Sequence, residues 1–268
     1  MIVGVDLGAS ALKIVAMDGD KVLFTYLENE RKRNLYNLIP KLLEKNGYKQ
    51  EDCRIVALTG VGVEYCTLEN TAEIVNVPEI EATGCGGTYL ADLEQAVVVS
   101  IGTGTSLVLA ENGKYSHIGG SGVGSGTLRG IAKKIMGINN VHEFVSFAEK
   151  GDRKKVDLLI KDLFSGAETL PMDLTASNLA KCSDEASEED WAAAYVNMVL
   201  EVAGSHAALA CNGYKIKNII ITGGLSQSEI AKECYANFDR LYPQTYIVPE
   251  YSGFATAIGA TRRALLGA

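Results

Sequence analysis

The stretch "VDLGASALKIVAMDGDK", Val5 to Lys21, decides the fold, because it describes two strands joined by a glycine turn and followed by another turn. An apolar run ends at Asp6, Gly8 interrupts it, a second apolar run follows, and Asp18-Gly19 marks the next reversal. Apolar runs separated by Gly or Asp-Gly turns are typical of β-hairpins. We therefore expect a meander of strands at the start of the chain.

The same pattern occurs again in "VSIGTGTSLVLAENGKY", Val99 to Tyr115. A gapless superposition places Gly8 on Gly102 and Gly19 on Gly113, and the apolar runs coincide. A recurring unit indicates a duplication, with chance similarity of two hairpins as the alternative. We expect two similar lobes, residues 1–93 and 94–268, with the option that the last helix returns toward the N-terminal lobe. Clefts between related halves are favoured ligand sites.

Helical patterns alternate with buried strands along the rest of the chain, which indicates α/β architecture. An apolar stripe that starts at Leu35 ends at Asn46-Gly47, a typical helix C-terminus. A longer helix begins after Ser187, and its apolar residues recur on one side as far as Leu209. This helix is expected to be central or to form a subunit interface.

Composition excludes several classes of protein. The net charge of −8 argues against a nucleic-acid partner. There is no apolar span of membrane length and no basic leader before the first apolar stretch, so we expect a cytoplasmic protein without a membrane partner. The six cysteines include no C-x-x-C pair, which favours reduced thiols.

Glycine is concentrated at four turns, residues 6–10, 100–106, 119–127 and 222–226, each directly after a buried strand or before a helix. The P-loop and dinucleotide motifs are both absent. Glycine turns of this kind expose successive N–H groups that bind anions. The run from Gly119 to Gly126 precedes a helix expected near Thr127, whose first N–H groups would add to such a site. The alternative is that these glycines only permit close packing.

Phosphoryl transfer also needs a metal holder, a cation and a base for the incoming hydroxyl. Asp6 ends the first strand beside Gly8, and Lys13 lies across the first hairpin. Glu79 and Glu81 flank Ile80, so one of them can face a cleft while the other is solvated. Taken singly, each of these residues also fits an ordinary surface or turn position.

With these elements in place, the chain resembles the type II pantothenate kinases of the acetate and sugar kinase/actin superfamily. The resemblance spans nearly the whole chain, and its most specific parts are "AEKGDRKKVDLLIKDLF" and "LPMDLTASNLAK", together with "GVDLGASALKIV", "SIGTGTSL" and "GGSGVGSGTLRGIAKKIMGI". It implies a two-lobed actin-like (ribonuclease H-like) ATPase fold with duplicated lobes. The implied reaction is ATP-dependent phosphorylation of pantothenate to 4'-phosphopantothenate, the first step of coenzyme A biosynthesis. It also implies a homodimer, and leaves open inhibition by coenzyme A or acyl-CoA.

The resemblance assigns roles to residues. Glu79 in "PEIEA" matches the catalytic base that accepts the pantothenate hydroxyl proton, and Asp6 matches the aspartate that holds Mg²⁺ through water. Ser106 and His117 are implied to lie near substrate. With the glycine turns, the expected nucleotide- and phosphate-binding residues are Asp6, Gly8, Ser10, Lys13, Gly102, Thr103, Gly104, Thr105, Gly120, Gly122, Gly124, Ser125, Gly126, Thr127, Gly223, Gly224 and Ser226.

One position departs from the family pattern. Family members carry an arginine, thought to hold the pantothenate carboxylate, where this chain has His117. Arginine is a permanent bidentate cation and histidine is not. A kinase of another small hydroxylated metabolite therefore stays open, as do an ATP-binding activator with Cys85 as a cluster ligand and an inactive nucleotide-binding member.

Overall fold

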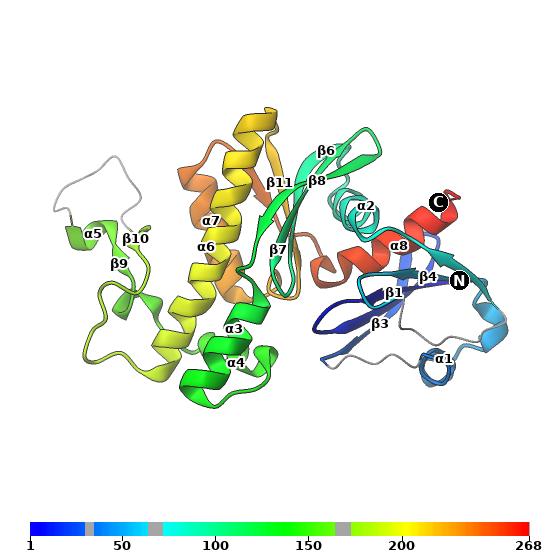
Figure 1. The fold of residues 1–268 in the computed structure, drawn as a ribbon, viewed down its shortest axis with the longest axis horizontal. Coiled ribbons are helices and arrows are strands. Elements are labelled where there is room, and N and C mark those ends of the chain that lie inside the picture. The colour runs from blue at the N-terminus through cyan, green and yellow to red at the C-terminus, as the bar shows by residue number, and fades with distance from the viewer. Residues whose placement is uncertain (30–34, 64–71, 164–172, 268) are drawn as a thin grey trace.

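A computed structural model describes residues 1–29, 35–63, 72–163 and 173–267 of the chain. Figure 1 shows two lobes side by side, each built around a five-stranded sheet, with helices α2 and α8 between them. The N-terminal sheet has the order β3-β2-β1-β4-β5. Its strands are β1 (Ile2–Leu7), β2 (Leu12–Asp18), β3 (Lys21–Glu28), β4 (Ile55–Thr59) and β5 (Glu73–Asn76).

The C-terminal sheet repeats this order. It runs β12-β11-β6-β7-β8, so each sheet has an antiparallel three-stranded meander beside two parallel strands. Its strands are β6 (Gln95–Ile101), β7 (Thr105–Glu111), β8 (Lys114–Ser121), β11 (Asn218–Gly223) and β12 (Thr245–Ile247). The expected duplicated α/β fold is confirmed. The expected boundary at residue 93 stays a prediction.

The two hairpins differ at their first turn. Leu7 pairs with Leu12 in the N-terminal sheet, whereas Ile101 pairs with Thr105, so the second turn is one residue shorter. The gapless superposition is therefore wrong beyond the turn, where Leu12 corresponds to Thr105. Sequence comparison missed this because both turns are glycine-containing and both second strands are apolar.

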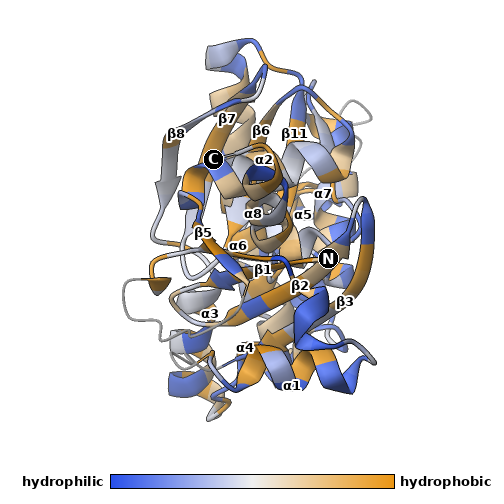
Figure 2. Ribbon diagram, turned by 90° about the vertical axis from the view of Figure 1, so that its right-hand side faces the viewer, coloured by the Kyte–Doolittle hydropathy of each residue, from blue (hydrophilic) through white to orange (hydrophobic). Residues whose placement is uncertain are grey.

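Helices cover both faces of each sheet. Helix α1 (Leu38–Lys45) packs its apolar side against β1, β2 and β4, and its alternating orange and blue segments are visible in Figure 2. On the C-terminal sheet, one apolar cluster joins the strands to four helices, which are α3 (Ser125–Ile131), α4 (Val141–Ala148), α6 (Glu188–Tyr214) and α7 (Glu229–Leu241). Because both sheet faces are buried, the inner strands read as continuous apolar runs.

Helices α2 (Glu79–Ala91) and α8 (Ala255–Leu265) pack against each other between the lobes. A Cβ on Gly86 would collide with the Ala255 carbonyl, and one on Gly259 would collide with the Ala82 carbonyl. The two backbones are therefore in direct contact, which requires glycine at both positions. Helix α8 also packs on β1, β2 and β4, so the last helix of the chain lies against the N-terminal sheet.

An arm projects from the C-terminal lobe on the side far from the N-terminal sheet (Figure 1). It contains β9 (Leu158–Leu159), α5 (Ile160–Leu163) and β10 (Thr175–Ser177). The buried Arg153 binds Asp157 and Thr175, and Asp157 also accepts from Asn197 of α6. The family-specific motifs around Arg153 and Thr175 thus hold this arm on α6.

Candidate active site between the lobes

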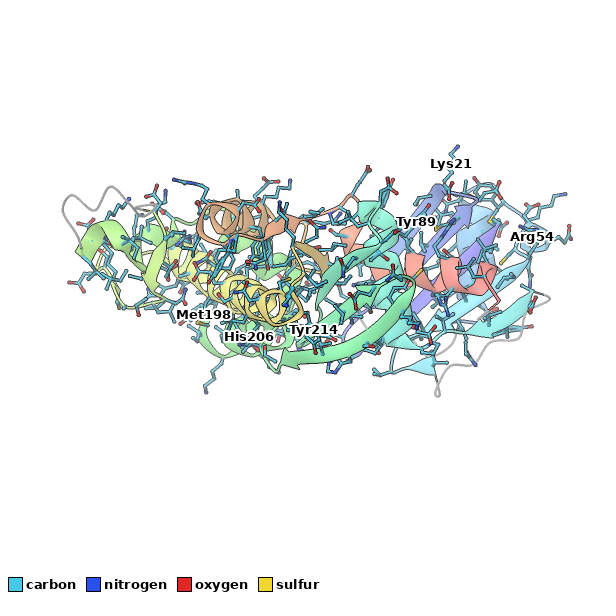
Figure 3. All side chains as sticks on the ribbon, turned by 90° about the horizontal axis from the view of Figure 1, so that it is seen from above. Lys21, Arg54, Tyr89, Met198, His206 and Tyr214 are labelled. Carbon is cyan, nitrogen blue, oxygen red and sulfur yellow. The ribbon has the colours of Figure 1, made fainter. Side chains whose placement is uncertain are left out.

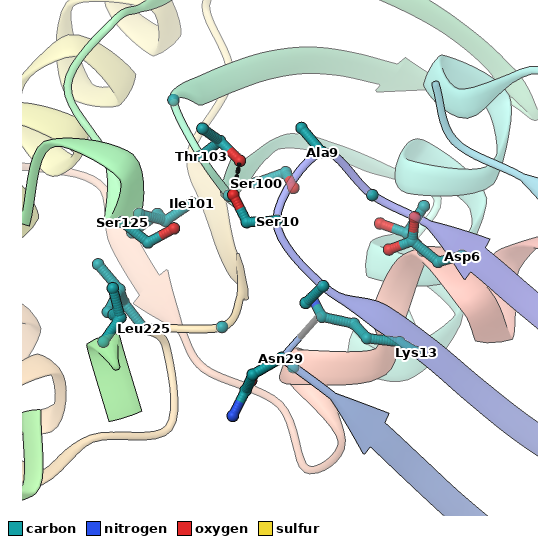
Figure 4. A pocket seen from close by; sticks show the side chains of 18 of the residues that line it. Asp6, Ala9, Ser10, Lys13, Asn29, Ser100, Ile101, Thr103, Ser125 and Leu225 are labelled. Carbon is teal, nitrogen blue, oxygen red and sulfur yellow. Dashed lines mark hydrogen bonds between the residues drawn. The ribbon is translucent and has the colours of Figure 1, made fainter. Parts of the chain in front are cut away.

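A cavity of about 730 Å³ opens between the two lobes. Figure 4 shows its walls: Asp6 and Lys13 come from the N-terminal sheet, and Thr103 and Leu225 from the C-terminal lobe. The predicted site residues that line it are Asp6, Gly8, Ser10, Lys13, Glu79, Gly102, Thr103, Gly104, Thr105, Ser106, Ser125 and Gly224. Residues far apart in sequence thus meet at one cavity.

The two equivalent hairpin turns face each other across this cavity. The Ser10 and Thr103 hydroxyl groups are 2.6 Å apart and hydrogen-bonded, and this contact joins the lobes (Figure 4). Beside it, a Cβ on Gly102 would meet nothing closer than the Gly104 carbonyl oxygen, at 3.7 Å. The two turns therefore present backbone to the cavity with little side-chain bulk, which suits a phosphate chain.

Three glycines of the third turn, residues 119–127, lie in close contact with the β6–β7 turn and the start of β7. A Cβ on Gly124 would lie 2.7 Å from the Gly102 and Thr103 carbonyl oxygens, and one on Gly126 would lie 2.8 Å from the Thr103 oxygen. Gly120 packs in the same way on the Thr105 carbonyl. Close packing accounts for these three glycines, whereas a Cβ on Gly122 would meet no atom and Ser125 lines the cavity, so nucleotide binding by this turn stays a prediction.

The helix that follows this turn begins at Ser125, two residues before the expected start. Its first amides are already used: Ser125 N donates to Gly102 O at 2.8 Å, and Gly126 N donates to Thr103 O at 2.9 Å. Thr127 Oγ1 donates to the Gly122 carbonyl and accepts from Gly124 N. Two of the first N–H groups of this helix are thus bonded to protein carbonyl oxygens, and anion binding at this helix start stays a prediction.

Asp6 is buried, with 8% of its surface exposed, yet its carboxylate makes no hydrogen bond or ion pair with any described residue. It lies opposite Lys13 in the β1–β2 ladder. Burial raises the pKa of Asp6, and the positive charge of Lys13 partly offsets that increase. An uncompensated buried carboxylate is costly, which points to a ligand at this position.

Glu79 is the first residue of α2 and reaches the cavity at its rim. Desolvation by the surrounding protein raises its pKa, and the nearby Asp6 carboxylate raises it further. Glu81 faces elsewhere and binds Arg263 of α8 through one oxygen, at 2.7 and 3.0 Å. The i, i+2 pair is thus divided between the cavity and the contact of α2 with α8.

The two expected substrate contacts lie apart. Ser106 lines the cavity, and its buried hydroxyl oxygen has no hydrogen-bond partner in the described ranges of the chain. His117 is exposed on β8, opposite Val108, and is not among the cavity-lining residues. Because Ser106 and Val108 are two apart on one strand, His117 lies on the same sheet face as Ser106, farther along.

The fourth turn contributes one residue to the cavity, Gly224, together with its neighbour Leu225. Gly223 has φ +100°, and a Cβ there would collide with the backbone of Ile101. The buried Ser226 hydroxyl binds the Gly223 carbonyl and Ser252, both at 2.7 Å. Gly223 and Ser226 therefore stabilise the conformation of this turn and do not line the cavity.

The cavity also contains residues that sequence reasoning missed. Arg129, Asn139 and His142 line its C-terminal side, and Asn29 and Thr256 line the other walls. Desolvation and the positive charge of Lys13 lower the pKa of His142, which favours its neutral imidazole at the cavity. No sequence motif predicts that these residues line a site, because only the tertiary fold brings them together.

The side chains at the cavity fit a magnesium ion that is held mainly by the phosphates of a bound substrate. Within the described residues, no three His, Cys, Asp or Glu side chains are placed to hold a metal ion. Mg²⁺ commonly uses one or two carboxylates plus substrate phosphates and waters. The unpartnered Asp6 carboxylate at the cavity wall matches that pattern.

The family model described as Fumble matches residues 92–263, well over half of the chain. The chain is 28% identical over 271 residues to a type II pantothenate kinase of Bacillus cereus strain G9842, covering 96% of each. It is 26% identical to one of Staphylococcus epidermidis, covering 97% of this chain and 99% of the relative.

Solved structures share the fold. The activator of 2-hydroxyisocaproyl-CoA dehydratase from Clostridium difficile with bound ADPNP superposes with a TM-score of 0.67 at 19% identity, covering 98% of this chain and 93% of the other. A ROK family glucokinase from Streptomyces griseus with glucose and AMPPNP has a TM-score of 0.64 at 11% identity, with 99% of each chain covered.

The raised pKa of Asp6 predicts how this residue affects stability. A carboxyl group whose pKa is higher in the folded chain stabilises it below the unfolded-state pKa and loses that contribution as pH rises through the folded-state pKa. Asp6→Asn should therefore increase the free energy of unfolding at pH 7 by about 1 kcal/mol. The gain should shrink as pH falls toward about 4.

Urea unfolding across this pH range measures the effect, with exposed Asp184→Asn as the control that should show no such gain. An Asp6→Asn chain less stable than wild type at pH 7 would contradict the interpretation.

Proposed function

Because the chain belongs to the Fumble family, we propose that it is an ATP-dependent kinase that phosphorylates pantothenate to 4'-phosphopantothenate, the first step of coenzyme A biosynthesis. The relatives named type II pantothenate kinase, which match nearly end to end, support this proposal. The observation that carries it is one cavity that holds Asp6, Glu79 and both hairpin turns.

In this proposal the triphosphate lies between the turns at 8–11 and 102–105. The Ser10–Thr103 hydrogen bond spans that position, so phosphate oxygens would replace each hydroxyl's partner. Lys13 supplies a cation on the same wall. Gly224 and Leu225 line the C-terminal side, where the nucleoside would lie. Solved relatives of the fold that contain ADPNP and AMPPNP are consistent with a nucleotide in this type of cleft.

Glu79 is the base in the proposed mechanism. Burial and the nearby Asp6 carboxylate raise the pKa of Glu79, which makes its carboxylate a stronger proton acceptor. The acceptor hydroxyl gives its proton to Glu79 as its oxygen attacks the terminal phosphorus in line. Ser106, with its unpartnered hydroxyl at the cavity, is placed to hydrogen-bond the acceptor.

A magnesium ion would supply charge neutralisation on the phosphate oxygens. Asp6 is the residue that would hold it, through water, because it lines the cavity and its carboxylate has no partner among the residues described. Ionisation of Asp6 is unfavourable in the empty cavity, so binding of a cation and ionisation of this group should favour each other.

His117 favours a second candidate for the phosphoryl acceptor, a small alcohol other than pantothenate. Its exposed imidazole, outside the cavity lining, is not an equivalent of a buried bidentate arginine. A small alcohol without a carboxylate would not need that contact. The same kinase chemistry then serves another hydroxylated metabolite.

An iron–sulfur activator function is less favoured by the chain's own residues. Cys85 is buried in α2 and packs near Tyr115. Neither the turn at 119–127 nor that at 222–226 contains the second cysteine that a shared cluster would need. The resemblance to the dehydratase activator therefore concerns the fold.

Helix α6 supports the proposed homodimer. Its partly exposed residues form an apolar stripe along one side, and Met198 and His206 mark this side in Figure 3. The stripe consists of Trp191, Tyr195, Met198, Val202 and Leu209. A stripe of this length on a 27-residue helix suits pairing with a second copy. No helix among the described residues has the length and apolarity to cross a membrane.

Glu79→Gln should lower kcat about 10²- to 10⁴-fold, because the amide cannot accept the hydroxyl proton. A coupled assay of ADP release with ATP, Mg²⁺ and pantothenate measures this change. Glu81→Gln is the matched control, since Glu81 binds Arg263 and should affect stability rather than kcat. Equal turnover by wild type and Glu79→Gln would remove Glu79 from the mechanism.

His117→Arg should lower the KM for pantothenate by up to about tenfold if the carboxylate contact is missing. The KM for an amide analogue without the carboxylate should not change. Ser116→Arg is the control, because Ser116 is also exposed on β8 but its side chain points to the opposite sheet face. If the wild-type enzyme preferred another alcohol in a substrate screen, that alcohol would replace pantothenate as the proposed acceptor.

Leu209→Asp should convert the proposed dimer to monomer, because it buries a charge in the apolar stripe. Sedimentation velocity measures the change. Leu241→Asp, also at an exposed leucine but on α7, should leave the dimer intact. A wild-type chain that sediments as a monomer contradicts the dimer.

A further inference from the structure

Thr59, the last residue of β4, has a polar group that the fold leaves without a partner. The residue is 1% exposed, and its hydroxyl oxygen has no hydrogen-bond partner among the residues that the structure describes. Buried hydroxyl groups are nearly always hydrogen-bonded, because losing water without a replacement is costly. An unpartnered one beside a candidate active site therefore calls for an explanation.

The duplication supplies an internal comparison. Thr222 is the second-last residue of β11 and pairs with Ser100 of β6, and Thr59 at the end of β4 pairs in the same way with Asp6 of β1. The Thr222 hydroxyl donates to the Val99 carbonyl at 2.9 Å. The equivalent carbonyl in the N-terminal lobe is that of Val5, and Thr59 does not use it. The two equivalent threonines thus differ in hydrogen bonding, and Thr59, the one without a partner among the described residues, is in the lobe that contains the buried Asp6 carboxylate.

Thr59 and Asp6 share one face of the N-terminal sheet. Ala57, two residues before Thr59, packs on α8, and a Cβ on Gly4, two residues before Asp6, would collide with the Ala257 carbonyl. Because side chains alternate along a strand, Thr59 and Asp6 point to the same side as Ala57 and Gly4. The two unpaired polar groups are therefore neighbours on adjacent strands.

The chain after Thr59 folds tightly over the Asp6 carboxylate. Gly60 has φ +94°, and a Cβ there would lie 2.9 Å from Asp6 Oδ1 and 2.8 Å from the Leu7 carbonyl oxygen. Only glycine permits this approach. The end of β4 is thus shaped around the carboxylate, which explains why Thr59 is held close to it.

We propose that Thr59 is a positioning residue for Asp6, whose hydroxyl donates to one carboxylate oxygen when Asp6 is charged and directs the other oxygen toward the cation in the cleft. This inference rests on the proposed function, because it takes Mg²⁺ and a nucleotide to be the ligands. Donation to a charged oxygen is a strong hydrogen bond, and it offsets the cost that Thr59 carries in the empty cleft.

Isothermal titration calorimetry with a non-hydrolysable ATP analogue, in Mg²⁺ and in EDTA, tests the role. In wild type, Mg²⁺ should strengthen binding. Thr59→Val keeps the shape and removes the donor, so the Mg²⁺-dependent gain should fall about tenfold while binding in EDTA is unchanged. Thr59→Ser should keep the gain, because it keeps the hydroxyl.

Thr261→Val on α8 is the matched control, since its buried hydroxyl already donates to the Ile258 carbonyl at 2.7 Å and lies outside the cavity lining. It should lower the Tm and leave the Mg²⁺-dependent gain intact. Thr59→Val should not lower the Tm, because no hydrogen bond is lost.

The proposal would be overturned if Mg²⁺ strengthened analogue binding to Thr59→Val as much as to wild type. It would also be overturned if Thr59→Ser lost as much of this gain as Thr59→Val, because that result would point to packing. Both results leave the proposed kinase standing, because wild type still binds the nucleotide. A wild-type chain that does not bind the analogue at all overturns the proposed function and this inference together.

Discussion

The architecture depends on one close contact, the crossing of α2 and α8. With glycine at Gly86 and Gly259, the helix backbones meet with no side chain between them. Helix α2 lies on the C-terminal sheet and α8 on the N-terminal sheet, so their contact sets the distance between the lobes. That distance in turn brings the turn at Ser10 within hydrogen-bonding reach of the turn at Thr103. Added bulk at the crossing would change the cleft itself.

The cleft is built from groups that the fold leaves unsatisfied. Within the described parts of the chain, the Asp6 carboxylate and the hydroxyl groups of Thr59 and Ser106 have no hydrogen-bond partner, although burial makes each of them costly. Elsewhere the same residue types are satisfied, as Thr222 and Asp157 illustrate. A ligand that completes these hydrogen bonds would remove this cost, whereas the buried Gln244 Oε1, which also lacks a partner among the described residues, lies outside the cavity lining.

Sequence reasoning located the glycine turns correctly but did not separate their two uses. Gly8 and Gly102 lie at the cavity, whereas Gly120, Gly124 and Gly126 allow one turn to pack against another. In the sequence these two cases look alike, because both need a position without a side chain. The sequence likewise predicts free N–H groups at a helix start near Thr127, and only the folded chain places carbonyl oxygens on the N–H groups of Ser125 and Gly126.

The sequence by itself determined the duplicated strand–turn–strand units, the α/β class and the acidic residue at the end of the first strand. These features depend on local turn chemistry and on the spacing of apolar residues, which are readable along the chain. Tertiary structure alone decided the one-residue difference between the hairpins and the pairing of Glu81 with Arg263. It also decided the cavity positions of Arg129 and His142, and the unpartnered state of Thr59. Whether a polar group is satisfied depends on atoms from distant segments, and their positions are fixed only when the lobes pack together.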